Sequence, residues 1–151
     1  MIRAHEVFRA GAPGEAATDE VVLDFDGRFR RRCVMVTERG LQFLLDLERA
    51  THLRAGDIIR LDDGRGVGVV AGTEPLARIR CENSEQLARL AWHLGNRHVP
   101  VMIHAGRINI RRDHVIEEMV RRLGGMIVHF EAPFDPEAGA YDTQSHQHDD
   151  Q

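Results

Sequence analysis

ARIRCENSEQLARLAWHLGNRHVPVMIHAGRINIRRDHVIEEMVRRLGGMIVHF, residues 77–130, alternates between two hydrophobic periods. Apolar residues recur at every second position in ARIRC, VPVMI, INI and MIVHF, as in half-buried strands, and every three or four positions in two longer segments, as in amphipathic helices. Gly106 marks a turn, so VPVMI and INI form a hairpin. The order β-α-β-β-α-β predicts a ferredoxin-like fold, in which two helices cover one face of a four-stranded sheet and leave the other face available for a partner.

Both helical segments carry start and stop signals. The first begins at Asn83, with Gln86 three residues later completing a capping box, and we expect Gly95 to end it in a left-handed conformation. The second begins after Asp113, whose side chain can cap it, and Gly124 ends it. Their buried stripes consist of Leu87, Leu90, Ala91 and Leu94 in the first helix and Ile116, Met119, Val120 and Leu123 in the second.

The first half of the chain is punctuated by short β-type segments. VVLDF, RFRRRCVMVT, LQFLLDL and IIRL are separated by Asp-Gly and other turn signals, and GRGVGVVAG is interpreted as a turn that leads into a strand. In LQFLLDL, alternate residues form one strongly apolar face, which consists of Leu41, Phe43, Leu45 and Leu47. The pattern contains no helix of any length, so we predict a small antiparallel β domain.

The fold class is therefore α+β, with a domain boundary near Glu74-Pro75. We predict an N-terminal β domain at residues 1–74 and a ferredoxin-like domain at residues 75–131. Residues 132–151 have few apolar side chains and no periodicity, which predicts a largely disordered tail that carries histidines.

Composition excludes several classes of protein. All 20 basic residues are arginine, so a Walker A phosphate loop and Schiff-base chemistry, which need a lysine, are both excluded. A formal net charge of -4 gives no general attraction to nucleic acid, and Arg30, Arg31 and Arg32 are interpreted as a solvated strand face. No segment has the length or apolar character of a membrane helix or a secretory signal, so we expect a cytoplasmic protein. No catalytic motif is present, and we predict no enzyme activity.

Four of the nine histidines are candidate metal ligands. His98 is expected at the start of the strand that follows the first helix. His114 is expected in the first turn of the second helix, where the positive helix end keeps imidazole neutral. In the tail, His146 and His148 project to the same side of an extended segment and could chelate one ion. Imidazole with carboxylate and without thiolate suits nickel, copper or zinc.

The remaining polar candidates have ordinary structural interpretations. His93 is expected to be a capping or interfacial group, and Glu117 and Glu118 are expected on the solvated face of the second helix. Isolated surface or sheet positions are expected for His5, His52, His104 and His129. Cys33 and Cys81 lie far apart without CxxC spacing and are interpreted as small core residues.

Three segments of the second half carry a family resemblance. They are HLGNRHVP (residues 93–100), DHVIEEMVRRLGG (residues 113–125) and APFDPEAGAY (residues 132–141), and a histidine-bearing tail follows them. Together they closely resemble the UreE family of urease accessory proteins. The resemblance implies a cytoplasmic, homodimeric metallochaperone that delivers nickel to the urease active site during maturation. Nickel is then cargo, for which zinc and copper compete. The implied partner is the urease accessory GTPase UreG, and neither nucleic acid nor a membrane is a partner.

The resemblance also implies roles for individual residues. His98 is the central metal ligand, His114 is an additional ligand in some members, and the tail ligands are His146 and His148. Arg112 stands where some members carry a further histidine, which argues against a side site there. The N-terminal domain is similar to peptide-binding domains of Hsp40-type chaperones. An alternative function is an assembly scaffold that binds urease or its accessory proteins through the apolar LQFLLDL face, without delivering metal.

Overall fold

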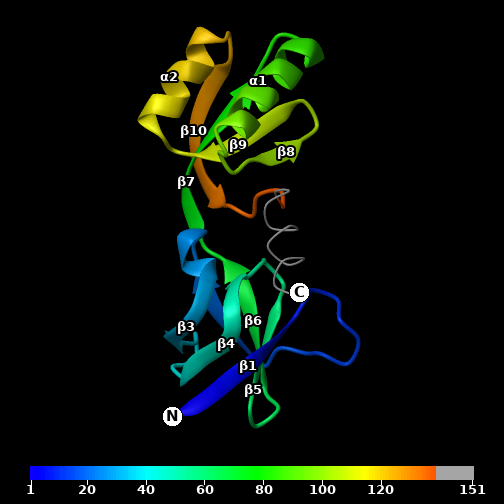
Figure 1. Cartoon of the computed structure of the whole chain (residues 1–151), viewed down its shortest axis with the longest axis vertical. Coiled ribbons are helices and arrows are strands. Elements are labelled where there is room, and N and C mark those ends of the chain that lie inside the picture. Colours follow the sequence, from blue (N-terminus) through cyan, green and yellow to red (C-terminus); the bar gives the residue numbers. More distant parts are fainter. Residues whose placement is uncertain (139–151) are drawn as a thin grey trace. The chain divides into compact units, whose positions relative to one another are not determined.

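The computed structural model describes residues 1–138, so the predicted ligands His146 and His148 lie outside the described residues (Figure 1). The chain divides into two compact units, Met1–Thr73 and a second that begins at Glu74. The described residues form two sheets and two α-helices, which confirms a mixed α+β fold. In this part of the chain, neither helix has the length and apolar character to cross a membrane.

The first unit is a six-stranded sheet with the strand order β2-β6-β5-β1-β4-β3. Its strands are β1 (Ile2–Phe8), β2 (Asp19–Leu23), β3 (Phe29–Val36), β4 (Gln42–His52), β5 (Ile58–Leu61) and β6 (Gly66–Ala71), with one turn of 3-10 helix at Asp26–Arg28. Phe43, Leu45 and Leu47 of β4 are buried in the core, as their alternation predicts. The same core includes Val21, Ile59 and Val69 from other strands of the sheet.

The prediction of an antiparallel sheet was wrong. Strand β1 pairs in parallel with β4, where Ala4 lies opposite Leu45, and β2 pairs in parallel with β6, where Val21 lies opposite Val69. Only the β3–β4, β5–β6 and β1–β5 pairs are antiparallel. Turn signals reveal hairpins between consecutive strands, whereas parallel pairs need long connections that leave no local signal. The sequence pattern also did not identify β1, a central strand.

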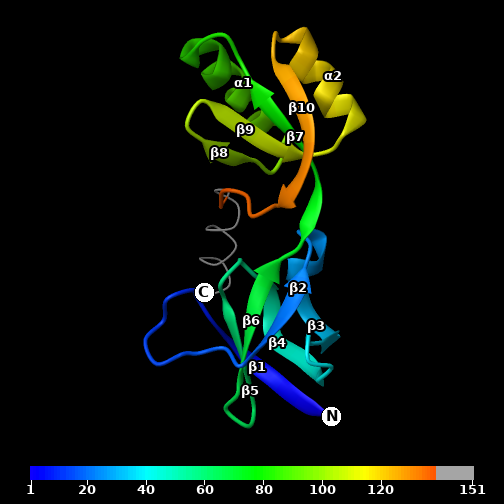
Figure 2. The same ribbon diagram turned by 180° about the vertical axis from the view of Figure 1, so that it is seen from behind.

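The second unit has the predicted element order β-α-β-β-α-β. Its elements are β7 (Thr73–Arg80), α1 (Ser84–Asn96), β8 (Met102–His104), β9 (Arg107–Arg111), α2 (His114–Arg122) and β10 (Met126–Pro133), and the strand order is β10-β7-β9-β8. Both helices lie on one side of the sheet, and the view from behind shows the side that they leave uncovered (Figures 1 and 2). The core between helices and sheet includes Ile79, Leu90, Leu94, Ile110 and Val120.

Side chains cap both helices as the sequence predicts. Asn83 Oδ1 accepts from the Gln86 N–H at 2.8 Å, and Gln86 Oε1 accepts from the Glu82 N–H at 3.2 Å. Asp113 Oδ1 accepts from the N–H groups of Val115 and Ile116, at 3.0 and 3.1 Å. These bonds satisfy donors that have no partner within the first turn of a helix.

Residues 132–138 are ordered, contrary to the prediction that a disordered tail begins at Ala132. Strand β10 continues to Pro133, and the next residue, Phe134, is fully buried. The chain then reaches β8, because the Asp135 N–H lies 3.3 Å from Met102 Sδ and the Glu137 N–H donates to the Val101 carbonyl at 2.8 Å. One buried aromatic ring is enough to order a segment that shows no hydrophobic period.

Gly66 begins β6 at a position without room for a side chain. A Cβ there would overlap the Ala16 carbonyl oxygen and lie 3.1 Å from Ile58 Cγ2. We expect Gly66→Ala to lower the free energy of unfolding by about 2 kcal/mol in urea denaturation. Gly95→Ala is the matched control, because nothing lies within 4 Å of a Cβ at that helical position, and it should raise stability by up to about 1 kcal/mol. Equal stability of the two variants would contradict this packing.

Candidate functional site

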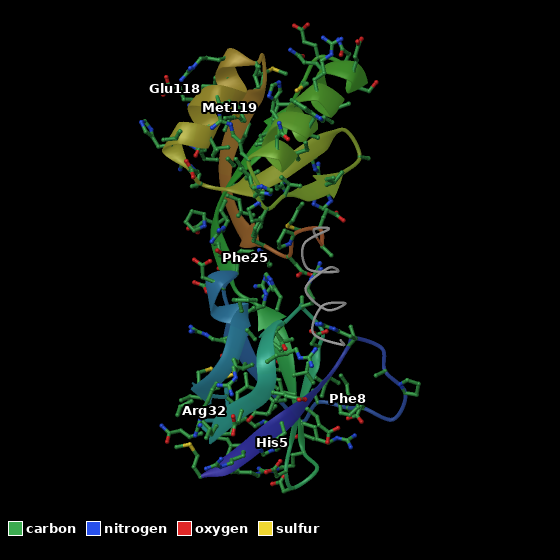
Figure 3. The ribbon with its side chains drawn as sticks, in the orientation of Figure 1. His5, Phe8, Phe25, Arg32, Glu118 and Met119 are labelled. Carbon is green, nitrogen blue, oxygen red and sulfur yellow. The ribbon has the colours of Figure 1, made fainter. Side chains whose placement is uncertain are left out.

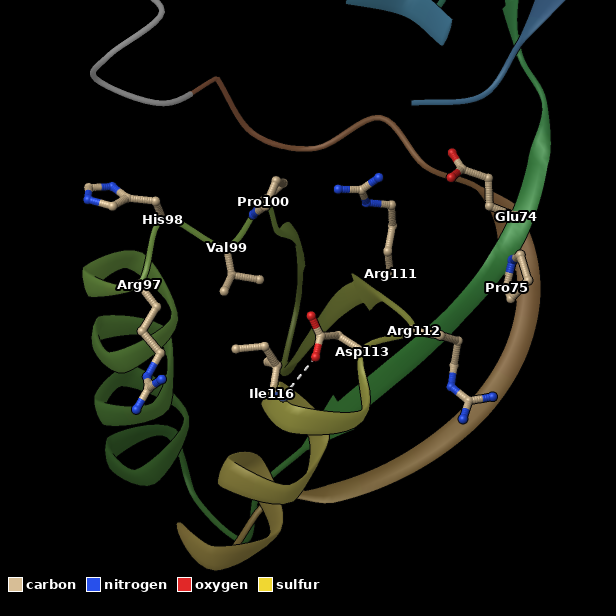
Figure 4. A pocket seen from close by; sticks show the side chains of 10 residues that line it. All are labelled: Glu74, Pro75, Arg97, His98, Val99, Pro100, Arg111, Arg112, Asp113 and Ile116. Carbon is tan, nitrogen blue, oxygen red and sulfur yellow. Dashed lines mark hydrogen bonds between the residues drawn. The ribbon is translucent and has the colours of Figure 1, made fainter. Parts of the chain in front are cut away.

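A groove of about 610 Å³ opens in the second unit where α1 ends and α2 begins (Figure 4). Its walls come from the residues after α1, from the link between β9 and α2, and from the start of β7. The lining residues are Glu74, Pro75, Arg97, His98, Val99, Pro100, Arg111, Arg112, Asp113 and Ile116. The groove therefore joins the two sequence segments, HLGNRHVP and DHVIEEMVRRLGG, that contain the predicted ligands His98 and His114.

His98 lies in the cap of α1 and not at the start of a strand, because β8 begins only at Met102. Among residues 1–138 it is the one non-glycine residue with a positive φ, 58°. The His98 N–H donates to the Gly95 carbonyl at 3.0 Å and the Val99 N–H donates to the Leu94 carbonyl at 3.1 Å. This pair of bonds is a Schellman motif, with His98 at the left-handed position. Gly95, which was predicted to hold that position, lies within the helix.

Helix α2 ends in the same motif but with glycine. The Gly124 N–H donates to the Arg121 carbonyl at 3.0 Å, the Gly125 N–H donates to the Val120 carbonyl at 2.9 Å, and the φ of Gly124 is 88°. A left-handed conformation costs a residue with a Cβ roughly 1 kcal/mol, a cost that glycine avoids. The chain therefore holds a histidine where its own second helix shows the favoured residue. Such strain occurs most often at functional positions.

The His98 ring is exposed and points away from the groove, whereas Val99 and Ile116 point into it (Figure 4). His114 is the first residue of α2 and is also exposed, but it does not line the groove. Residues 1–138 contain no group of three or more His, Cys, Asp or Glu side chains close enough together to hold a metal ion. The structure thus places both predicted ligands at adjoining helix ends without assembling a complete coordination shell from them.

Glu117 was wrongly predicted to be solvated. The residue is only 2% exposed, whereas its neighbour Glu118 points outward (Figure 3). The carboxylate of Glu117 accepts from Arg112 Nε at 3.1 Å and from the Asp113 N–H at 2.9 Å, and it lies 2.6 Å from His129 Nε2. His129, on β10, is therefore not the isolated sheet position that was predicted.

This network positions part of the groove. Arg112 and Asp113 line the groove, and Glu117 binds both of them. Burial raises the pKa of Glu117, but hydrogen bonds from His129, Arg112 and the Asp113 N–H outweigh it, so the pKa lies below its ordinary value. The available sequence signal was the four-residue spacing from the cap Asp113 to Glu117, which lets the carboxylate fold back onto the helix start.

Glu117→Gln should destabilise the protein at neutral pH by about 2 kcal/mol, because it weakens a buried, charge-assisted network. A lowered folded-state pKa means that this stabilisation is complete above the ordinary pKa of glutamate and is lost as pH falls through the lowered value. The difference between wild type and Glu117→Gln should therefore shrink on acidification in urea denaturation series. Glu118→Gln, at the exposed neighbour, is the control, and an equal effect of both changes would contradict the role of Glu117.

The strain at His98 can be measured by comparing two substitutions. His98→Gly and His98→Ala both remove the imidazole, but only alanine keeps a Cβ in the left-handed conformation. We expect His98→Gly to be more stable than His98→Ala by about 1 kcal/mol in chemical denaturation. If alanine were as stable as glycine, residue 98 would not be strained in solution.

Comparisons with known proteins show the family of this chain. The UreE urease accessory protein N-terminal domain matches residues 2–72, and the corresponding C-terminal domain matches residues 74–151. The urease accessory protein UreE of Bradyrhizobium sp. (strain ORS 278) is 57% identical over 148 residues, which cover 98% of this chain and 70% of the relative. That of Rhodopseudomonas palustris (strain BisB18) is 61% identical over 141 residues, covering 93% and 67%. The protein of the same name from Rhodobacter capsulatus is 44% identical over 151 residues, covering 98% and 94%.

These matches define an accessory protein and not an enzyme. The chain belongs to the UreE family of urease accessory proteins, which take part in urease maturation.

Proposed function

We propose that this protein is a nickel metallochaperone, which carries nickel as cargo and delivers it to urease during maturation. The observation that supports this function best is the left-handed backbone of His98, which displays an exposed imidazole at a helix end despite the conformational cost. An exposed ligand on a strained backbone suits transfer, because the ion stays accessible to a receiving protein.

The proposed metal site is shared between two copies of the chain. A two-fold axis beside His98 converts one surface histidine into two ligands for one ion, so dimerisation completes what a single chain supplies only in part. His114 is proposed as an additional ligand, and His146 and His148, outside the described residues, as ligands from the tail. Nickel is favoured over zinc and copper by availability and by partner contacts, since copper binds imidazole more tightly.

The two parts of the chain have separate proposed roles. Residues 75–131 form the ferredoxin-like domain that binds metal and dimerises, and residues 1–74 contact the urease maturation complex. The GTPase UreG is the proposed partner, and its nucleotide chemistry supplies the direction of transfer that this lysine-free chain lacks. The proposed location is the cytoplasm.

The alternative is an assembly scaffold that works through the N-terminal unit. The sequence suggested the apolar LQFLLDL face as its binding surface, but Phe43, Leu45 and Leu47 are buried in the core. A different feature now supports it. The edge strand β3 exposes Val34 and Val36, at 53% and 54%, and these side chains offer an apolar strip to a partner.

Nickel titration by calorimetry, with parallel light scattering, tests the main proposal. We expect one tightly bound ion per dimer in the wild type and loss of that ion in His98→Ala. His104→Ala, which removes another exposed histidine of the same unit, should bind normally, and the double change of His146 and His148 to alanine should weaken binding without abolishing it. Nickel bound once per monomer and unaffected by His98→Ala would contradict a shared site and favour the scaffold.

A further inference from the structure

The side of the second sheet that faces away from the helices carries arginines without acidic partners. Arg78 and Arg80 lie on β7 and Arg107 lies on β9, and within residues 1–138 none of the three forms an ion pair. The chain has more carboxylates than arginines, 24 to 20. Several guanidinium groups on one face without an ion pair are therefore unusual. We call this surface the arginine face.

Cross-strand register shows that these side chains share one face. Arg78 lies opposite Asn109, and Asn109 lies opposite Met102 on β8. On the other edge, the Arg78 guanidinium lies over the Phe130 ring of β10, 4.4 Å from its centroid. These side chains thus form a single row that crosses all four strands. The row lies on the helix-free side of the sheet, which faces the viewer in Figure 2.

Alternation along each strand extends the face by one row. Arg80 follows Arg78 by two positions, Arg107 precedes Asn109 by two, and Val128 precedes Phe130 by two. Arg80 is exposed and Val128 is 60% exposed. The residues between them, such as Ile79 and Ile108, point into the helix-covered core. The arginine face therefore combines positive charge with an apolar margin on β10.

Asn109 supplies an independent sign that the face binds a ligand. It is only 4% exposed, yet its Oδ1 atom has no hydrogen-bond partner among the described residues. The Nε atoms of Arg78 and Arg107, which flank it, are likewise buried without a partner. Buried polar atoms are normally paired, so three unpaired atoms in two neighbouring rows of one face form a site that a ligand can complete.

The chemistry of the row indicates the class of ligand. Arginine forks pair with carboxylates in bidentate geometry. A side-chain amide such as that of Asn109 can accept from an N–H and donate to a C=O, which is how it binds a peptide unit. The exposed Val128 and Met126 fit an apolar side chain. Arginine forks also pair with phosphates, but a nucleic-acid backbone has neither peptide groups nor apolar side chains. Carboxylates, peptide groups and apolar side chains occur together in an acidic polypeptide segment.

We propose that the arginine face binds an extended, acidic segment of a partner protein, with Arg78, Arg80 and Arg107 pairing its carboxylates and Asn109 binding its backbone. None of these four residues lines the His98 groove, and the proposal requires no metal. Because the whole chain carries a net charge of -4, only a local arrangement of arginines can attract such a segment.

The test measures fluorescence anisotropy of two labelled ten-residue peptides with the full chain in EDTA, one alternating Glu and Val and the other alternating Lys and Val. We expect the Glu peptide to bind and the Lys peptide to bind at least tenfold more weakly, opposite to the order that the net charge favours. The double variant Arg78→Gln/Arg107→Gln should weaken Glu-peptide binding at least tenfold, and so should Arg80→Gln, whose exposed side chain is not needed for folding. The control Arg31→Gln/Arg32→Gln, at two exposed positions of β3, should bind within twofold of wild type.

Asn109→Val separates a binding role from a structural one. Removing a buried, unpaired amide should raise the melting temperature while it weakens Glu-peptide binding. Binding unchanged by Asn109→Val and by the arginine variants would overturn the proposal. So would a preference for the Lys peptide, or a loss of duplex DNA binding in the arginine variants without a change for the peptide. A halved mass of Arg78→Gln/Arg107→Gln in light scattering would show that a second copy of the chain occupies the face, which also overturns it.

Discussion

The arrangement of the second unit depends most on the hydrogen bonds that the Glu117 carboxylate makes. It ties the start of α2 to the link from β9 through Arg112 and the Asp113 N–H, and it ties the helix to β10 through His129. The link from β9, the start of α2 and strand β10 are thus held together by one buried carboxylate. Removing any one donor leaves the buried carboxylate with fewer hydrogen bonds, which is unfavourable. The network therefore stabilises one geometry more strongly than apolar packing alone would.

The same unit shows how a helix end can present a side chain. Both helices close with a Schellman motif, and both motifs pack an apolar residue against the core, but only α1 has a side chain at the left-handed position. The two backbone hydrogen bonds and the buried Leu94 hold His98 in this conformation. The backbone conformation of residue 98, and with it the direction of the Cα–Cβ bond, is therefore set by the helix cap.

Local features of the sequence predicted much of this structure, and non-local features did not. The caps at Asn83 and Asp113 and the apolar stripes lie within one or two helical turns, so the pattern alone identified both helices. Strand β1 and the two parallel pairings were missed because their partners lie tens of residues away. The local spacing from Asp113 to Glu117 was available as a signal, but the contact of Glu117 with His129 was missed because His129 approaches from another element. His98 was identified as a candidate ligand, but its left-handed backbone could not be predicted because that position strongly favours glycine.

The proposed metal site and the proposed arginine face rest on two kinds of side chain whose charges respond differently to pH. Imidazole must be neutral to bind a metal ion, so a histidine site loses its ion as pH falls through the range in which histidine titrates. Guanidinium stays charged throughout that range. An arginine face therefore keeps its affinity for carboxylates under conditions in which the histidine site empties. If both proposals hold, acidification releases the cargo while a partner held by arginine remains bound.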